Sequence, residues 1–129
     1  MRWNGIAATP WEVALGYILA VAGSILTHRA MAANRFFAPV VRIQKERRHQ
    51  VVDSGPYRPV RHPGNLGNVL VYIASPFMLA SRWAWIPSGL SIVLTVVRTV
   101  LEDRMLRQQL VGYEDYAQRT TKRLVPAVW

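Results

Sequence analysis

The 129-residue sequence contains no cysteine, which excludes a disulfide framework, a thiolate zinc site and a cysteine nucleophile. It lacks a Gly-x-Ser-x-Gly nucleophile elbow and the Gly-x-Gly-x-x-Gly of a Rossmann cofactor domain. The histidines have no Asp/Glu-His partner motif, so we predict no metal site. Acidic residues are scarce: 7 Asp and Glu stand against 16 Lys and Arg, a formal net charge of +9. Such a balance is typical of proteins that bind nucleic acid or an anionic membrane face.

Long uncharged runs make up much of the chain. Hydrophobic residues account for 51% and mean hydropathy is +0.10, which excludes a disordered protein. A membrane-spanning helix needs about 20 mostly apolar residues, and three runs contain no charge: 13–27, 63–81 and 83–97. We therefore predict an all-α membrane protein whose last two spans form a helical hairpin, with about three transmembrane helices at residues 10–29, 64–81 and 83–101.

Two alternatives compete with this interpretation of the runs. Any one of them could be a core helix of a soluble protein, although three together are unusual in a domain of this size. The first could be a signal peptide with Ala30-Met31-Ala32 as its cleavage box, but His28 and Arg29 sit directly before that box. We therefore expect the first run to be retained as a span.

The basic residues are distributed unevenly around the three runs. Fourteen of the sixteen lie within residues 28–62 or from residue 98 onwards, and only Arg2 and Arg82 lie elsewhere. Because Lys and Arg flank membrane spans on the cytoplasmic side, we predict one domain in the inner (cytoplasmic) membrane, with a cytoplasmic connector at 30–63 and a cytoplasmic tail at 102–129. Nucleic-acid binding would not produce this partition, and no nucleic-acid motif is present.

Candidate chemistry lies near the predicted cytoplasmic boundary. Arg98 and Glu102 are four residues apart, on one face of the third span, where charge is unusual unless it pairs or binds a ligand. His62 comes just before the second span, whose first N–H groups and positive dipole end can bind a carboxylate or phosphate. His49 lies in the same basic connector. A helix ion pair and two surface histidines are the plainer interpretations, so these residues alone leave the function open.

An ordered set of motifs surrounds the predicted hairpin. It consists of Gly55-Pro56-Tyr57, Val60-Arg61-His62-Pro63, Gly67, Arg98, Leu101-Glu102-Asp103, Leu106, Gly112-Tyr113-x-x-Tyr116 and Arg123-Leu124-x-Pro126. Over residues 34–129 this set resembles the isoprenylcysteine carboxyl methyltransferase family. Members of that family are integral-membrane enzymes that use S-adenosylmethionine and are related to phospholipid N-methyltransferases. The resemblance implies that the connector and the C-terminal helices enclose S-adenosylmethionine at the cytoplasmic face.

The resemblance also implies roles for individual residues. Arg98 and Arg119 are expected to act at the methyl acceptor as catalytic residues. The sequence departs from the family at Asn65, where an aromatic residue is usual. Many relatives carry extra N-terminal spans, and a homo-oligomer could complete the bundle here. The expected cofactor-binding residues are Gln44, His49, Gln50, Val51, Val52, Tyr57, His62, Pro63, Gly64, Asn65 and Glu102.

The expected reaction is O-methylation of a prenylated cysteine carboxylate or a similar lipid-like acceptor. Such a carboxylate is already a nucleophile at neutral pH, and it needs a cation such as Arg98 to hold it. Two alternatives stay open. A phospholipid N-methyltransferase would have to deprotonate an amine, for which His62 is the candidate base. A non-catalytic small membrane protein would keep the fold without the activity.

Overall fold

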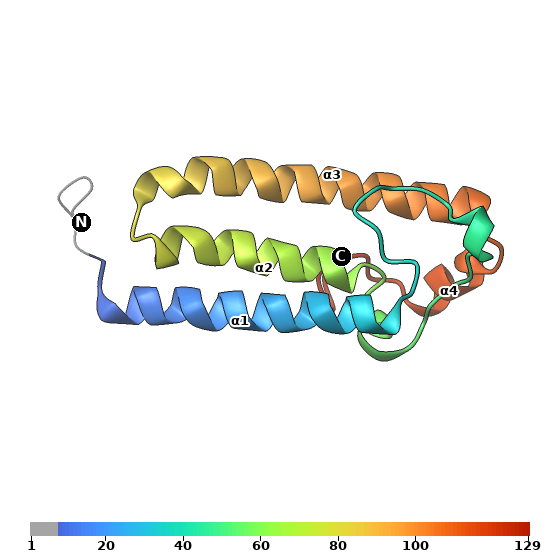
Figure 1. Ribbon diagram of the computed structural model, residues 1–129, viewed down its shortest axis with the longest axis horizontal. Coiled ribbons are helices and arrows are strands. Elements are labelled where there is room, and N and C mark those ends of the chain that lie inside the picture. Colours follow the sequence, from blue (N-terminus) through green and yellow to red (C-terminus); the bar gives the residue numbers. More distant parts are fainter. Residues whose placement is uncertain (1–7) are drawn as a thin grey trace.

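The computed structural model describes residues 8–129, which form helices and loops without a β-strand (Figure 1). The all-α prediction is thereby confirmed for this part of the chain, whereas Arg2 lies outside the described residues. The α-helices are α1 (Pro10–Ala33), α2 (Pro63–Met78), α3 (Trp85–Gln109) and α4 (Tyr113–Arg119). Short 3-10 helices lie between them: η1 (Lys45–Arg47), η2 (Gly55–Tyr57) and η3 (Arg82–Ala84).

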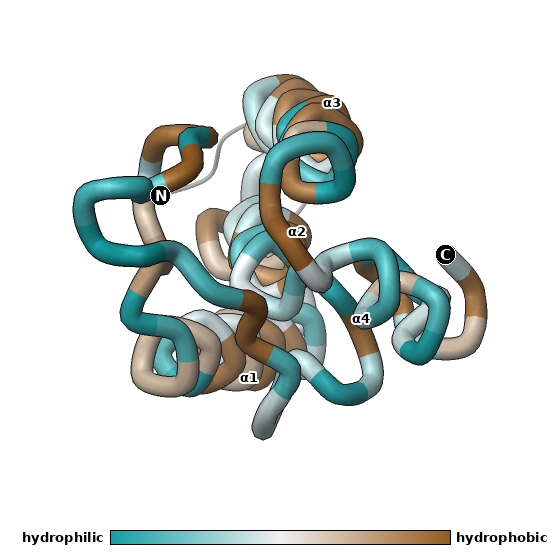
Figure 2. Tube along the Cα trace, turned by 90° about the vertical axis from the view of Figure 1, so that its right-hand side faces the viewer, coloured by the Kyte–Doolittle hydropathy of each residue, from teal (hydrophilic) through white to brown (hydrophobic). Residues whose placement is uncertain are grey.

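The three long helices lie side by side, with α2 between α1 and α3, in both the side view and the end view (Figures 1 and 2). Helices α1 and α2 approach each other closely at Gly23 and Gly67. A Cβ atom added to Gly23 would lie 2.6 Å from the carbonyl oxygen of Gly67. Small residues allow this close backbone contact, which is common between helices in membranes.

Two of the long helices have the length and apolar composition needed to cross a membrane. They cover Pro10–Ala33 and Arg82–Gln109. Helix α2 has only 16 residues, a length of about 24 Å against a hydrocarbon core of about 30 Å. The predicted second span at 64–81 is therefore shorter than expected. The helix ends at Met78, and Ala80 then adopts a left-handed backbone conformation with φ of 51°. The three-span count stays a prediction.

The outward faces of α1 and α3 are apolar. Exposed side chains include Trp11, Ile18, Ile25, Leu90 and Leu94. The buried residues of α3 are instead polar: Ser88, Thr95, Thr99 and Asp103. The hydroxyls of Thr95 and Thr99 donate to the carbonyls of Ser91 and Thr95, both at 2.8 Å. Apolar residues outside and satisfied polar residues inside fit a lipid environment, where every polar group needs a partner within the protein.

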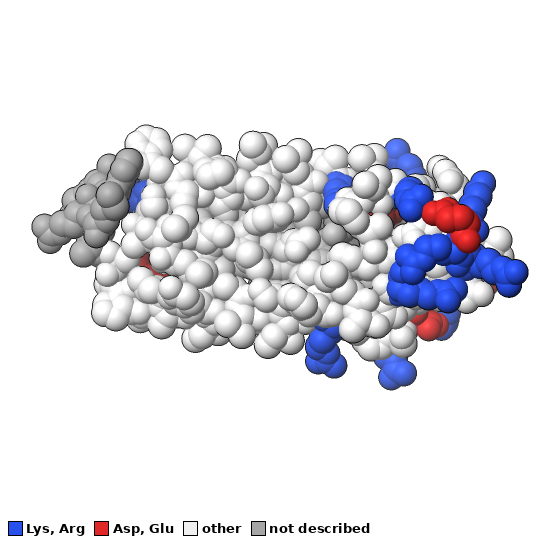
Figure 3. Space-filling view, viewed as in Figure 1, with Lys and Arg blue, Asp and Glu red and all other residues white. Residues whose placement is uncertain are grey.

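Charged residues gather at one end of the molecule. In the face drawn in Figure 3, most Lys and Arg side chains cover the end where the connector and α4 lie, while the middle of that face is uncharged. This is the distribution expected from the sequence. It separates an apolar section formed by the three long helices from a polar section formed by the connector, α4 and the tail.

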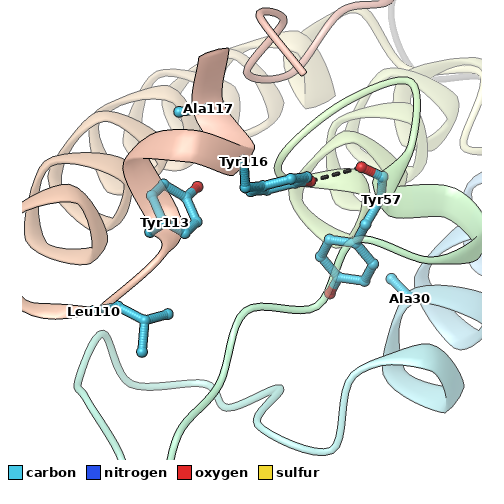
Figure 4. Close-up of a cluster of buried hydrophobic side chains, with 6 residues drawn as sticks. All are labelled: Ala30, Tyr57, Leu110, Tyr113, Tyr116 and Ala117. Atoms are coloured by element: carbon cyan, nitrogen blue, oxygen red, sulfur yellow. Dashed lines mark hydrogen bonds between the residues drawn. The ribbon is translucent and has the colours of Figure 1, made fainter. Parts of the chain in front are cut away.

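The polar section has its own hydrophobic core. Ala30 at the end of α1 and Leu110 after α3 pack with Tyr57, Tyr113, Tyr116 and Ala117 (Figure 4). The Tyr116 hydroxyl donates to the backbone carbonyl of Tyr57 at 2.6 Å. This contact joins α4 to η2, although 59 residues separate them. The cluster therefore fixes the connector and α4 against the ends of the long helices.

Candidate active site

A cavity that is partly open to solvent lies in the polar section. Its walls come from four segments of the chain: the connector, the region from η2 to the start of α2, the end of α3 and α4. The connector contributes aromatic and apolar residues, including Phe36, Phe37 and Val40. Helix α3 contributes Arg98 and Glu102 and, one turn further on, Met105 and Leu106. Segments far apart in the sequence thus enclose one space.

Most residues expected at the site line this cavity. Arg98 is one of them, and the others are His49, Gln50, Val51, Val52, Tyr57, His62, Gly64, Asn65 and Glu102. Three expected residues do not. Pro63 is buried as the first residue of α2. Arg119 has a side chain that is 65% exposed, and its Nη1 lies 3.4 Å from the Asp53 carboxylate.

Gln44, the third of these residues, lies behind the cavity wall and is 2% exposed. Its side-chain Nε2 donates to the Phe36 carbonyl at 2.7 Å, and its Oε1 accepts from Arg47 at 2.8 Å. Its backbone N–H donates to Nδ1 of His49 at 3.2 Å. Gln44 therefore holds the connector in shape and orients His49, rather than facing a ligand itself.

Glu102 is the carboxylate of the cavity. Its Oε2 lies 3.4 Å from Nδ2 of Asn65, 3.9 Å from Nδ1 of His62 and 4.0 Å from Nε of Arg98. These distances are at or beyond the range of ordinary hydrogen bonds. Glu102 thus keeps capacity to accept hydrogen bonds from a ligand. Asn65 is held in place by a second bond, which its Nδ2 donates to the Thr99 hydroxyl at 3.1 Å.

Arg98 links α3 to the connector at the cavity wall. Its Nη2 donates to the carbonyl of Ala38 at 2.9 Å. Its Nε is buried and has no hydrogen-bond partner among the described residues. A buried, unpaired guanidinium N–H is costly, and a carboxylate entering the cavity would satisfy it.

Asp103, the residue after Glu102, forms the centre of a buried ion cluster. Arg61 binds it through two parallel hydrogen bonds, Nε–Oδ1 at 2.7 Å and Nη2–Oδ2 at 2.9 Å. Arg123 and Arg107 approach Oδ2 at 3.2 and 3.4 Å, and Tyr113 donates to Oδ1 at 3.0 Å. Arg61 also donates to the carbonyls of Thr120 and Thr121, which belong to the tail. The cluster joins α2, α3, α4 and the tail.

Sequence reasoning did not find Asp103 or most of the apolar wall. The signal for Asp103 was its place beside Glu102 in a span that otherwise avoids acidic residues. The signal for Arg61 was its place beside His62. Phe36, Phe37 and Met105 belong to no motif, and only the fold brings them to the cavity.

Burial shifts the titration of groups outside the long helices. Desolvation raises the pKa of Tyr57 to about 12, and it raises the pKa values of Tyr113 and Tyr116 further. These phenols stay protonated: Tyr113 and Tyr116 donate hydrogen bonds to Asp103 and to the Tyr57 carbonyl, whereas the Tyr57 hydroxyl accepts one from Asn34. Desolvation lowers the pKa of His49, so that its neutral form is favoured.

Within residues 8–129 no group of three or more His, Asp or Glu side chains is arranged to bind a metal ion.

Comparison with known proteins identifies the family. The sequence model of the phospholipid methyltransferase family matches residues 11–111. The chain belongs to this family. It is also similar to a probable protein-S-isoprenylcysteine O-methyltransferase of Oryza sativa subsp. indica, with 27% identity over 113 residues that cover 84% of this chain and 59% of the relative. Protein-S-isoprenylcysteine O-methyltransferase B of Arabidopsis thaliana is 26% identical over 112 residues, which cover 84% of this chain and 57% of the relative.

These relatives confirm the resemblance to isoprenylcysteine carboxyl methyltransferases that the motifs indicated. The chain spans somewhat over half the length of the curated relatives that it matches. No solved structure matches the chain. The cavity therefore has to be interpreted from its own residues.

Proposed function

We propose that the protein is an integral-membrane, S-adenosylmethionine-dependent methyltransferase that O-methylates the carboxylate of a prenylated cysteine or a similar lipid-like acceptor. One observation carries the proposal: a single cavity at the polar end of an apolar helix bundle contains both Glu102 and Arg98. Glu102 is a carboxylate with free accepting capacity, and Arg98 is a half-buried cation whose buried Nε has no hydrogen-bond partner among residues 8–129. An anionic acceptor and a cationic methyl donor need such opposite charges close together.

The residues of the cavity fit the chemical groups of the cofactor. S-adenosylmethionine, when bound, supplies an electrophilic methyl group on a sulfonium. Glu102 would accept hydrogen bonds from its ammonium group. The backbone N–H groups of Gly64 and Asn65 lie in the first turn of α2, have no intrahelical acceptor and suit its carboxylate. The apolar and aromatic walls, including Phe37 and Leu106, suit its adenine ring.

Arg98 would hold the acceptor carboxylate and orient one oxygen for in-line displacement. A carboxylate needs no base at neutral pH, so positioning and the removal of water are the main contributions left to the protein. The acceptor's hydrocarbon part would lie along the exposed apolar surfaces of the long helices. Arg119 is not part of this mechanism, because its side chain is exposed outside the cavity.

Phospholipid N-methylation is the second candidate, and two observations favour it. The family model bears that name. His62 lies on the cavity wall and is 5% exposed, so a buried imidazole is present to take the proton of an amine acceptor. The two reactions differ in whether the acceptor is an anion held by Arg98 or an amine deprotonated by His62.

Acceptor assays separate the two reactions. Purified protein in nanodiscs would be given S-adenosylmethionine with a labelled methyl group and either a prenylcysteine analogue or phosphatidylethanolamine. Label in a base-labile methyl ester of the first acceptor supports O-methylation, whereas label in the lipid headgroup supports the alternative. Failure to bind S-adenosylmethionine in calorimetry would refute both and favour a non-catalytic protein.

We also propose that α1, α2 and α3 all cross the bilayer, with the connector and the tail on the cytoplasmic side. The chain contains no cysteine, so single cysteines can report the side of the membrane without a background. Variants Lys45→Cys and Glu114→Cys should react with an impermeant maleimide only from the cytoplasmic side, and Trp83→Cys only from the opposite side. Labelling of positions 45 and 114 from opposite sides would contradict the site itself, because both flank one cavity.

A further inference from the structure

The buried Asp103 has a partner on the cavity wall. Its Oδ1 lies 3.2 Å from Nε2 of His62, in addition to its contacts with Arg61, Arg123 and Tyr113. Asp103 itself does not line the cavity, whereas His62 does. Any effect of Asp103 on a ligand therefore has to pass through a neighbour.

The charges around Asp103 decide which nitrogen of His62 carries the proton. Three guanidinium groups within 3.4 Å keep the carboxylate ionised, and an ionised carboxylate only accepts hydrogen bonds. The Tyr113 hydroxyl already donates its proton to the same oxygen at 3.0 Å. The close approach of His62 Nε2 to Oδ1 at 3.2 Å, shorter than the 3.4 Å from Nε2 to the Tyr113 hydroxyl, favours a proton on Nε2, and in a neutral imidazole Nδ1 is then unprotonated.

The other ring nitrogen of His62 points towards Glu102. Nδ1 and the Glu102 Oε2 lie 3.9 Å apart, which is too long for a direct hydrogen bond. Both atoms are acceptors when His62 is neutral. Two acceptors at this separation can be bridged by one group that carries at least two N–H or O–H bonds, such as a primary ammonium.

We infer that Asp103 is a positioning residue that fixes His62 as the Nε2–H tautomer, so that its Nδ1 and the Glu102 carboxylate together form an acceptor pair for a protonated amino group of the ligand. The inference rests on the proposed function in one respect, because that function supplies a ligand with an ammonium group. The tautomer itself can be tested without any ligand.

The histidines of the chain provide internal standards. The sequence contains three of them. Nδ1 of His28 lies 2.7 Å from the Ser24 carbonyl, which can only accept, so His28 is the Nδ1–H tautomer. His49 receives the Gln44 N–H on Nδ1, so its proton is on Nε2. Histidines 28 and 49 are thus expected to give the two opposite patterns in one spectrum, and His62 is expected to match His49.

The test is a long-range 1H–15N correlation spectrum of protein labelled with 15N-histidine. It would be recorded in nanodiscs at mildly alkaline pH, and signals would be assigned with His28→Gln and His49→Gln. We expect the Nε2–H pattern for His62, and on titration with S-adenosylmethionine its Nδ1 signal should shift while that of His28 stays in place. A proton on Nδ1, alone or with Nε2, would overturn the inference. If the Nε2–H pattern does not respond although calorimetry shows that the cofactor binds, the acceptor pair is refuted. If calorimetry shows no binding, the proposed function is refuted instead.

A variant then tests the role of Asp103. In Asp103→Asn the side-chain amide can donate to Nε2, which should move the His62 proton to Nδ1 and turn an acceptor into a donor. The dissociation constant for S-adenosylmethionine should rise about tenfold, the effect of losing one charge-assisted hydrogen bond. Asp115→Asn, at an exposed position on α4, should change neither the tautomer nor the affinity.

Misfolding of Asp103→Asn would be visible in the same spectrum. Unchanged signals of His28 and His49 show that the fold is kept, and an unaltered His62 tautomer with wild-type affinity would then refute the positioning role. If those two signals collapse, the wild-type tautomer and its response to the cofactor decide the matter.

Discussion

The substitution Glu102→Gln removes the negative charge from the cavity while keeping the size of the side chain. The local structure should persist, because Asn65 keeps its bond to Thr99 at 3.1 Å and Arg98 keeps its bond to the Ala38 carbonyl at 2.9 Å. None of the three groups near the carboxylate forms a short ion pair with it. The main loss should therefore be an interaction with the ligand rather than folding stability.

The size of that loss follows from the type of bond. A hydrogen bond to a charged group contributes about 1.5–3 kcal/mol, and each 1.4 kcal/mol is a factor of ten, so the dissociation constant for S-adenosylmethionine should rise by about 10- to 100-fold. Isothermal titration calorimetry with the purified protein in nanodiscs measures this constant directly. Thermal unfolding of the same samples shows whether the fold is unchanged.

Glu114→Gln is the matched control for this experiment. It makes the same chemical change at a carboxylate on α4 that is 53% exposed and lies 3.7 Å from Arg107. Its affinity for the cofactor should equal that of the wild type. Wild-type affinity in Glu102→Gln, or an equal loss in both variants, would show that Glu102 does not contact the cofactor's cation.

Three further predictions concern other parts of the chain. Arg98→Gln removes one charge-assisted bond, so it should raise the KM for the acceptor about tenfold in steady-state assays without changing the cofactor's dissociation constant. An equal rise in the KM for the acceptor and in the cofactor's dissociation constant would argue against a role at the acceptor. Gly67→Val should lower the unfolding free energy by about 1–3 kcal/mol through overpacking against α1, whereas Gly89→Val, where a Cβ meets nothing within 4 Å, should leave the Tm unchanged. Burial lowers the pKa of His49 below its ordinary 6.5, so near that pH the unfolded chain binds more protons than the folded chain. The free energy of unfolding should therefore fall as the pH drops below 6.5. His49→Gln should make this dependence on pH less steep in denaturant titrations at a series of pH values.

The sequence predicts the helical class and the distribution of charge well, because both depend on runs of residues that are read directly. It predicts the extent of α2 less well. Hydropathy counts the uncharged residues up to Ser81, but it cannot indicate that Ala80 adopts a left-handed conformation beyond the end of the helix.

The candidate site shows the same division. Motif order was sufficient to gather Arg98, Glu102 and His62, because the second half of α3 and the start of α2 both line one cavity. Arg119 has an exposed side chain on α4 and does not line the cavity, and its expected role at the acceptor stays a prediction. The side-chain hydrogen bonds of Gln44 stay within the connector, which residue type alone does not reveal, and its expected contact with the cofactor stays a prediction.

The backbone contacts between the tail and the start of α2 have a consequence for biosynthesis. The N–H groups of Arg61 and His62 donate to the carbonyls of Lys122 and Arg123, both at 2.9 Å. Translation and membrane insertion proceed from the N-terminus, so the long helices can enter the bilayer while these carbonyls are still inside the ribosome. We therefore expect the site to be complete only once residues 120–123 have emerged and closed onto the helix bundle.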